Sequence, residues 1–149
     1  MKSVLKFFLN VLVYALIVGG VVWGAPKFLS WKLGTEYPIA SITSGSMWPS
    51  LHRGDMIFIE AVPREALKAG DVVVWRNPSA APGGTQGFTI HRLVELRETT
   101  LVTKGDANFK NDDPVGYDRL IGRTAMFRGK PFRIPYLGYV TITASKYQQ

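Results

Sequence analysis

The chain has 149 residues, a formal net charge of +7, two histidines and no cysteine. This length suffices for one domain with a modest hydrophobic core, and the missing cysteines exclude a thiol nucleophile, a disulfide framework and the commonest zinc sites. The basic residues are scattered without interleaved aromatic side chains and match no nucleic-acid-binding module, so we expect no nucleic-acid partner.

The N-terminal part of the chain is strongly apolar. Residues 7–25 carry no charge, and as a helix they would span roughly 28 Å, close to the hydrocarbon thickness of a bilayer. A cleaved signal peptide is the alternative, but this segment is longer than usual, and Ala25, its small-residue exit, is followed directly by Pro26. We therefore predict a membrane anchor in residues 1–25, with a single transmembrane helix at about 7–25. Lysines on both flanks leave its orientation open.

Short apolar segments alternate with turns through the rest of the chain, residues 26–149. In a chain with 15 glycines and nine prolines, this pattern is typical of a mostly β domain. The segments that we predict as strands are 38–43, 56–59, 72–75, 88–96, 101–103 and 120–122. The only soluble helix that we expect is a turn or two at 63–68.

A flexible turn, Ser44-Gly45-Ser46, lies between the first two predicted strands. Such a turn can present a hydroxyl together with exposed backbone N–H groups, as a nucleophilic serine requires, although Ser-Gly-Ser is also common in ordinary loops. A serine nucleophile needs a base. His91 lies in the middle of a predicted strand, on its more polar face, whereas His52 lies in a turn where we expect it to be exposed and structural. A lone strand histidine is itself more often structural than catalytic.

A turn-rich segment at 104–114 carries three carboxylates, Asp106, Asp112 and Asp113. They could bind calcium, but their spacing does not match an EF-hand loop, and turn composition alone explains much of the segment. With only two histidines and no paired ligand spacing, we expect no metal and no cofactor. A carboxylate here could instead hold a histidine in the tautomer that a serine protease needs.

The order of the sequence boxes resembles that of the type I signal peptidases, most closely the endoplasmic-reticulum and archaeal subtype. The boxes are SGSMWPSLHRGD at 44–55, GDVVVW at 70–75, IHRLVEL at 90–96, TKGDANFKNDD at 103–113, IGRTAMF at 121–127 and IPYLGYVTI at 134–142. The commoner bacterial type has a lysine where His91 stands. A lysine base must be desolvated to become neutral, whereas a histidine, with an ordinary pKa of about 6.5, can act near neutral pH without such burial.

The resemblance implies three catalytic positions in the first boxes. Ser46 matches the nucleophile, and His91 matches the general base. Ser44 matches a position whose hydroxyl joins the backbone N–H of the nucleophile in the oxyanion hole. Ser41, Ile42 and Thr43 would pair with the extended substrate as an added β-strand. Met47 and Trp48, apolar and next to the nucleophile, are expected to lie toward the bilayer surface.

The same resemblance implies that aspartates of the fourth box support the histidine. We predict that Asp112 orients His91 and that Asp106 supports the site, with Asp113 the adjacent rival of Asp112. The box departs from the usual family pattern, because Ala107 replaces an asparagine and two residues at 109–110 look inserted. Which aspartate faces the histidine is therefore open.

The implied protein is a signal peptidase I, a membrane-bound serine endopeptidase with a signal-peptidase-like coiled β-sheet as its catalytic domain at 26–149. It would remove N-terminal signal peptides from secretory preproteins after small residues at positions −3 and −1, on the extracytoplasmic or lumenal side. Expected partners are these preproteins, the lipid bilayer and accessory membrane subunits. One alternative is a catalytically inactive, membrane-tethered β domain that binds a protein partner. Another is a self-cleaving repressor-type Ser-Lys protease, which the anchor and the histidine argue against.

Overall fold

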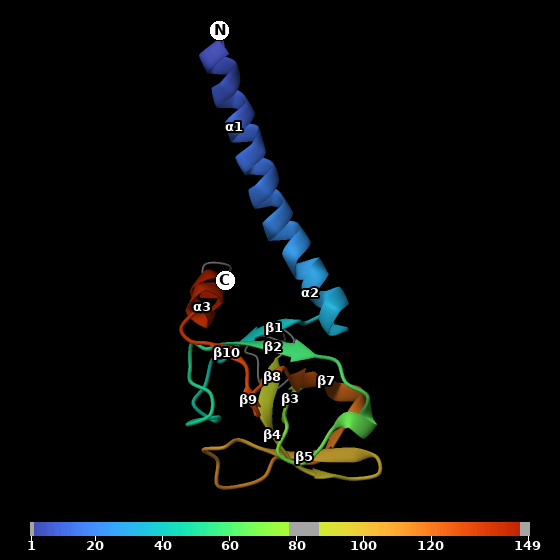
Figure 1. The fold of residues 1–149 in the computed structure, drawn as a ribbon. Coiled ribbons are helices and arrows are strands. Elements are labelled where there is room, and N and C mark those ends of the chain that lie inside the picture. The colour runs from blue at the N-terminus through green and yellow to red at the C-terminus, as the bar shows by residue number, and fades with distance from the viewer. Residues whose placement is uncertain (1, 78–86, 147–149) are drawn as a thin grey trace.

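The computed structural model describes residues 2–77 and 87–146. It consists of a long N-terminal helix that extends away from a β domain, with a short C-terminal helix on the domain (Figure 1). The prediction of a mostly β fold behind one N-terminal apolar helix is confirmed.

The N-terminal helix is continuous but changes its winding once. It runs as α1 (Lys2–Gly19), a π-helical turn at Gly20–Gly24 and α2 (Ala25–Leu33). Pro26, in the first turn of α2, lacks an N–H and cannot complete the usual α-helical bonding, and the wider π turn before it absorbs the mismatch. Among the described residues it is the one helix long and apolar enough to cross a membrane, from Ser3 to Leu33, so it continues past residue 25.

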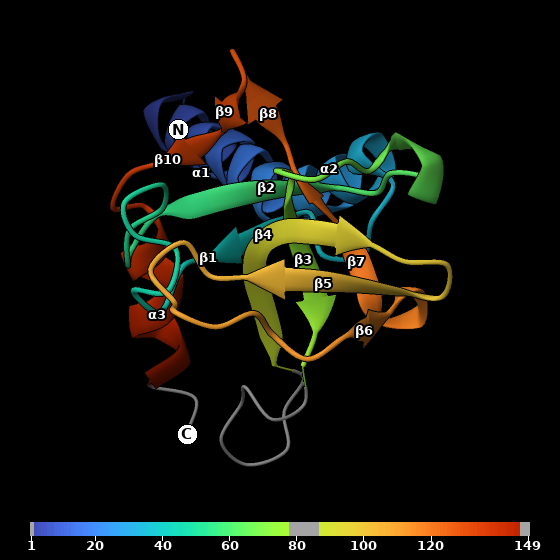
Figure 2. The ribbon, with the colours of Figure 1, turned by 90° about the horizontal axis from the view of Figure 1, so that it is seen from below.

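Eight strands form one antiparallel sheet that curls into a half-barrel, in the order β1-β2-β7-β3-β4-β5-β6 with β10 also paired to β2 (Figure 2). These strands are β1 (Ile39–Ser41), β2 (Met56–Glu60), β3 (Val72–Arg76), β4 (Phe88–Leu96), β5 (Thr100–Lys104), β6 (Val115–Gly116), β7 (Leu120–Thr124) and β10 (Arg133–Ile134). A separate hairpin joins β8 (Met126–Phe127) to β9 (Lys130–Pro131). β1 lies at one edge of the sheet, paired only to β2.

The core lies on both faces of β3. Val72 and Val74 pack into the cluster beneath the β1–β2 connection, while Val73 and Trp75 pack into a second cluster with β5 and β6. A strand buried on both faces has no polar face to show, which explains why its sequence is a continuous apolar run. β3 pairs with β4 along its whole length, so the buried β3 holds β4 and the side chains of β4 in a fixed position.

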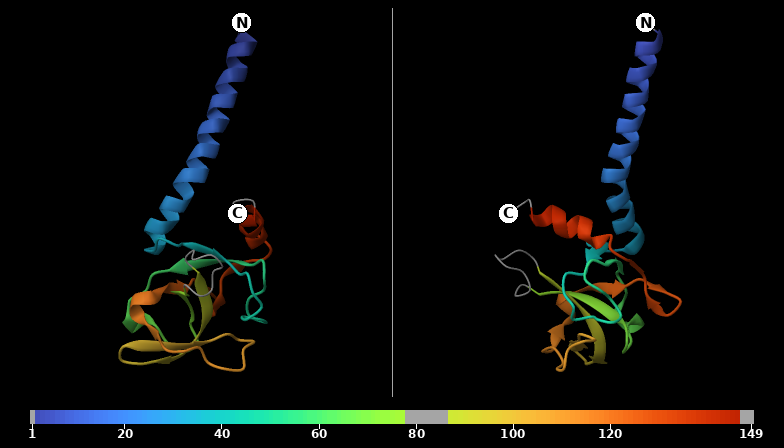
Figure 3. Two further views of the ribbon diagram at one scale, coloured as in Figure 1. Left: turned by 180° about the vertical axis from the view of Figure 1, so that it is seen from behind. Right: turned by 90° about the vertical axis from the view of Figure 1, so that its left-hand side faces the viewer.

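The helical segments of the β domain differ from the prediction in two places. In the predicted helical segment 63–68 a single 3-10 turn forms at Arg64–Ala66. A nine-residue helix, α3 (Gly138–Lys146), was not predicted, so the expectation of only one soluble helix is wrong. Its β-branched residues, typical of strands, hide it from pattern analysis. α3 packs beside β1, on the side of the domain that faces the long helix (Figures 1 and 3).

Candidate active site

The connection from β1 to β2, residues 42–55, carries Ser44 and Ser46. It is pinned to the core by Met47 and Leu51, whose side chains are 1% and 0% exposed. The expectation that Met47 lies toward the bilayer is therefore wrong, because this side chain is the anchor of the loop. Trp48 beside it is 59% exposed. Burying two apolar side chains within the connection holds the half-buried Ser46 in one place.

Ser46, His91 and Asp112 form one chain of hydrogen bonds. Ser46 Oγ lies 3.1 Å from His91 Nε2, and His91 Nδ1 lies 2.6 Å from Asp112 Oδ2. Since an ionised carboxylate can only accept, the Nδ1 atom carries the proton and Nε2 is left to accept from the serine hydroxyl. His91 is 8% exposed and lies on β4 opposite Val73 of β3, so its ring is fixed by packing as well as by bonding.

Asp112 is held in turn by β5. The buried Thr103 donates its hydroxyl to Asp112 Oδ2 at 2.5 Å, and the Asp112 N–H donates to the Thr103 carbonyl at 2.8 Å. Two bonds to one strand residue leave the carboxylate little freedom to turn away from the imidazole. Asp113, its neighbour in sequence, is exposed and makes no side-chain hydrogen bond with the described residues.

Asp106 binds an arginine and not the histidine. Its two carboxylate oxygens accept from Nε and Nη2 of Arg92, both at 2.7 Å, in a bidentate pair. Burial raises the pKa of Asp106, but hydrogen bonds from Arg92 and Ser50 outweigh it and hold the pKa below its ordinary value. The hydrogen bond to Asp106 likewise raises the pKa of Arg92. Asp106 thus stays outside the chain of bonds that ends at the serine.

The loop that carries Asp106 also contacts the backbone of Ser46. The Ala107 N–H donates to the Ser46 carbonyl at 2.8 Å. A Cβ at Gly105 would lie 2.7 Å from that same carbonyl oxygen, so only glycine permits this close approach. The Lys-Gly-Asp-Ala-Asn box therefore supports the backbone of Ser46. Asp106 within this box and Asp112 after it both bind side chains of β4.

Ser44 lies next to Ser46. Its Oγ is 3.1 Å from Ser46 Oγ. The Ser46 N–H makes no hydrogen bond within the described residues and is therefore open to a ligand. His52, in contrast, is exposed in the loop, where its N–H donates to the buried Asp55 at 2.8 Å and its ring stays outside the serine site.

A groove of about 670 Å³ begins at these residues and runs along the free edge of β1. It is bounded by three segments, which are residues 39–47, the first part of β4 and helix α3. The lining residues are Ile39, Ala40, Ser41, Ile42, Thr43, Ser44, Ser46, Met47, Phe88, Thr89, Ile90, His91, Thr141 and Ile142. The predicted substrate residues Ser41, Ile42 and Thr43 thus share one groove with Ser46 and His91.

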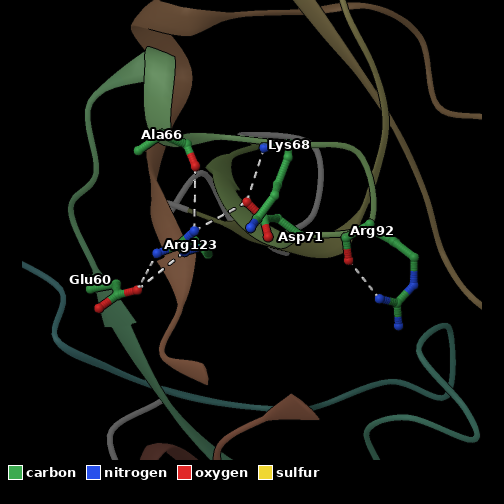
Figure 4. Close-up of polar contacts among 7 residues, drawn as sticks. Glu60, Ala66, Lys68, Asp71, Arg92 and Arg123 are labelled. Atoms are coloured by element: carbon green, nitrogen blue, oxygen red, sulfur yellow. Dashed lines mark hydrogen bonds and ion pairs between the residues drawn. The ribbon is translucent and has the colours of Figure 1, made fainter. Parts of the chain in front are cut away.

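Arginines clamp the turn before β3 from two sides (Figure 4). Arg92 donates to the Gly70 carbonyl at 2.7 Å, and Arg123 binds Glu60 at 2.9 Å and the buried Asp71 at 3.3 Å. These contacts join β2, β7 and β4 to the turn before β3. No group of three histidine, cysteine, aspartate or glutamate side chains within the described part of the chain is placed to hold a metal ion.

Comparison with known proteins identifies the family. No family model matches the chain. The signal peptidase complex catalytic subunit SEC11C of Homo sapiens is 31% identical over 152 residues, which cover 95% of this chain and 74% of that protein. The proteins named signal peptidase complex catalytic subunit SEC11 from Schizophyllum commune and Lachancea thermotolerans are 30% and 35% identical, covering 94% and 93% of this chain and 83% and 82% of their own. The chain belongs to the type I signal peptidases.

The family predicted from the sequence boxes of this signal peptidase is thereby confirmed. Sequence reasoning missed three side chains at the site, namely Thr103, Arg92 and Thr141. Thr103 and Arg92 had a weak signal, because a threonine beside the Lys-Gly-Asp box and an arginine directly after a candidate base both lie in boxes that carry the resemblance. Thr141 also lies in such a box, at 134–142, but its place at the groove depends on a helix that the pattern does not predict.

Proposed function

We propose that this chain is a membrane-bound serine endopeptidase, a signal peptidase I that removes N-terminal signal peptides from secretory preproteins. The observation that carries this proposal is the hydrogen-bonded series from Ser46 through His91 to Asp112 at the mouth of an open groove. Membership of the signal peptidase family supports it, and a catalytically inactive tethered domain is not favoured, because every group that acyl transfer requires is present.

The chemistry begins with Ser46. Its Oγ attacks the scissile carbonyl while His91 Nε2 takes the hydroxyl proton, and the resulting imidazolium is stabilised by Asp112 at Nδ1. The C–N bond then breaks as His91 returns the proton to the leaving amine. Water, activated by the same imidazole, hydrolyses the acyl-enzyme and frees Ser46.

The developing oxyanion would be met by the open N–H of Ser46 and the Ser44 hydroxyl. The distance of 3.1 Å between Ser44 Oγ and Ser46 Oγ supports this role, because a donor so close to the attacking oxygen is within reach of the carbonyl that it attacks. Removing one such donor costs about 2.7–4 kcal/mol of transition-state stabilisation in a serine protease.

The substrate would add to the free edge of β1 as an extended strand. Both backbone polar groups of Ile42 are already bound, its N–H to Asp55 and its carbonyl to Gly54. Because backbone groups alternate in direction along a strand, those of Ser41 and Thr43 point to the open edge and are available to a substrate backbone. Ile42 contributes its buried side chain, which closes the floor of the groove and admits only small residues at −3 and −1.

The anchor would place this groove at the membrane where a signal peptide ends. We propose residues 1–25 as the anchor and 26–149 as the catalytic domain on the extracytoplasmic or lumenal side. The relatives are named as subunits of a signal peptidase complex, so accessory membrane subunits are proposed partners alongside the preprotein and the lipid bilayer.

The test is cleavage of a secretory preprotein by the detergent-solubilised full chain. We expect one product whose new N-terminus follows a small residue, and we expect Ser46→Ala to lower the rate by about 10⁴- to 10⁶-fold. The far-ultraviolet circular dichroism of the variant should match the wild type, because Ser46 supports little packing. A preprotein left uncut by the wild type, or cut equally by Ser46→Ala, would contradict the proposal.

A further inference from the structure

Helix α3 forms a wall of the groove that sequence reasoning did not foresee. Thr141 and Ile142 line the groove, and Thr141 Oγ1 lies 2.5 Å from Ser41 Oγ on β1. The helix lies beside β1 (Figure 1), and its contact with Ser41 shows that it covers the face to which the Ser41 side chain points.

This wall is fixed to the loop that carries the serine. The Gly138 N–H donates to the Gly54 carbonyl at 2.9 Å, and a Cβ at Gly138 would lie 2.6 Å from the Asp55 carbonyl oxygen. The Tyr139 ring lies directly over Gly54. Just before the helix, Arg133 binds the 3%-exposed carboxylate of Asp55 at 2.7 Å. Tied at its first turn, α3 is a static wall and not a lid.

The two faces of β1 differ in what covers them. Ala40 and Ile42 face the apolar core, whereas Ser41 faces α3. A strand added beside β1 alternates its side chains between the same two faces. Side chains at −1 and −3 of a substrate therefore share one face, and those at −2 and −4 share the other. The face closed by Ile42 and Met47, which are 3% and 1% exposed, has the shallow floor that suits small residues.

We propose that α3 selects the substrate side chains at −2 and −4, through Thr141 and Ile142. This inference rests on the proposed function and adds a specificity wall to the same groove. A wall of fixed position limits the size of those side chains. A larger residue at position 141 should therefore exclude large substrate side chains at −2 and −4, and a smaller residue should admit larger ones.

The test measures kcat/KM of the full chain with two preproteins that differ only at −2, one with glycine and one with phenylalanine. Thr141→Trp should lower cleavage of the phenylalanine substrate relative to the glycine substrate by about 10- to 200-fold, the range that steric contact in a pocket commonly supplies. Thr143→Trp is the matched control, since Thr143 is exposed on the same helix outside the groove, and its ratio should equal that of the wild type. Thr141→Val keeps the volume and removes the hydroxyl, so its ratio should also stay unchanged.

The outcomes separate this inference from the proposed function. If the wild type cuts both preproteins but Thr141→Trp leaves their ratio unchanged, α3 does not select at −2. If Thr141→Trp instead alters the preference at −1 or −3, the two faces are assigned the wrong way round and the inference is also wrong. Should Thr141→Trp cut neither substrate, Thr141→Leu adds less volume and must show the same direction of change. A wild type that cuts neither preprotein rejects the proposed function itself.

Discussion

Neighbouring residues of β4 hold two aspartates of one loop in contrasting ways. His91 binds Asp112, and the same imidazole reaches Ser46. Arg92 binds Asp106, and its remaining donors go to the Gly70 carbonyl and the Ser50 hydroxyl. Because successive side chains of a strand point to opposite faces, the two pairs share a backbone and face different surroundings.

The difference lies in which partner can give up a proton. An imidazole changes its charge near neutral pH, so its carboxylate can stabilise a charge that comes and goes during a reaction. A guanidinium keeps its charge at every relevant pH, so its carboxylate can only hold structure. One aspartate is thus placed to act on a reaction, while the other joins the turn before β3 to the loop beneath Ser46. Substitutions should separate these two roles.

The largest effect on the comparison should come from Asp112→Asn. An amide cannot fix the Nδ1–H tautomer or stabilise the imidazolium, and the corresponding change in a serine protease triad lowers kcat by about 10⁴. The thermal midpoint should barely move, since Thr103 can still donate to the amide oxygen. Preprotein cleavage rates and thermal unfolding of the detergent-solubilised chain measure both. A variant that loses stability yet keeps its kcat would reverse the roles assigned to the two aspartates.

Ser44→Ala extends the comparison along the catalytic side. It removes one oxyanion donor and leaves the Ser46 N–H in place, so we expect kcat to fall by about 10²- to 10³-fold. KM should change little, because the donor acts mainly in the transition state. Ser50→Ala is the control on the structural side, where loss of a bond to Arg92 should leave kcat close to that of the wild type. Equal losses in the two variants would argue against an oxyanion role for Ser44.

Asp106→Asn should act mainly on stability. Loss of charged hydrogen bonds to Arg92 should cost about 1–3 kcal/mol of unfolding free energy. The pKa of Asp106 is lowered in the folded protein, so its ionised form stabilises the fold above the unfolded pKa of about 4. This contribution disappears as the pH falls through the folded pKa. Urea unfolding at a series of pH values should therefore show the wild type and the variant converging in acid. A constant gap at every pH would mean that ionisation is not what the pair contributes.

The smallest effect is expected from Asp113→Asn. The side chain is exposed and binds none of the described residues. The cleavage rate should therefore stay within about twofold of the wild type, and the unfolding free energy within about 0.5 kcal/mol. The same two assays apply. A tenfold loss of kcat in this variant would move the role of orienting His91 from Asp112 to its neighbour.

Local pattern was sufficient for some of this architecture. The buried run of β3 and the charge-free stretch 7–25 of the N-terminal helix follow directly from hydropathy along the chain, and so does the β class. The assignment of aspartates does not, because Asp106 and Asp112 have the same turn-rich surroundings in sequence. Which one meets His91 depends on the register between β4 and β5, where Arg92 faces Lys104 and Leu93 faces Thr103. That register is a long-range property of the folded sheet.

Sequence patterns could not predict helix α3 or the burial of Met47, for a related reason. Residues 138–146 are rich in β-branched side chains, and the contact of Gly138 with the Gly54–Asp55 turn lies more than eighty positions away in sequence. Met47 is apolar next to an exposed serine, and its burial depends on the clustering of β2 and β3 beneath the loop. Both features come from tertiary packing that overrides local preference.

The C-terminal end of the long helix is bonded to the β domain. α2 ends at Gly34 in a left-handed cap, and the Ala61 N–H donates to the Leu33 carbonyl at 2.8 Å, so the helix end is bonded to the residue that directly follows β2. A helix turns by about 100° and rises about 1.5 Å per residue. Deleting one residue of α2 would therefore swing the groove around the membrane normal by over a quarter of a circle while scarcely changing its height. Activity should therefore depend on the rotation that the deletion causes. We expect activity to be lost when the deleted residues make up a fraction of a helical turn, and to return when they make up nearly a whole turn of about 3.6 residues.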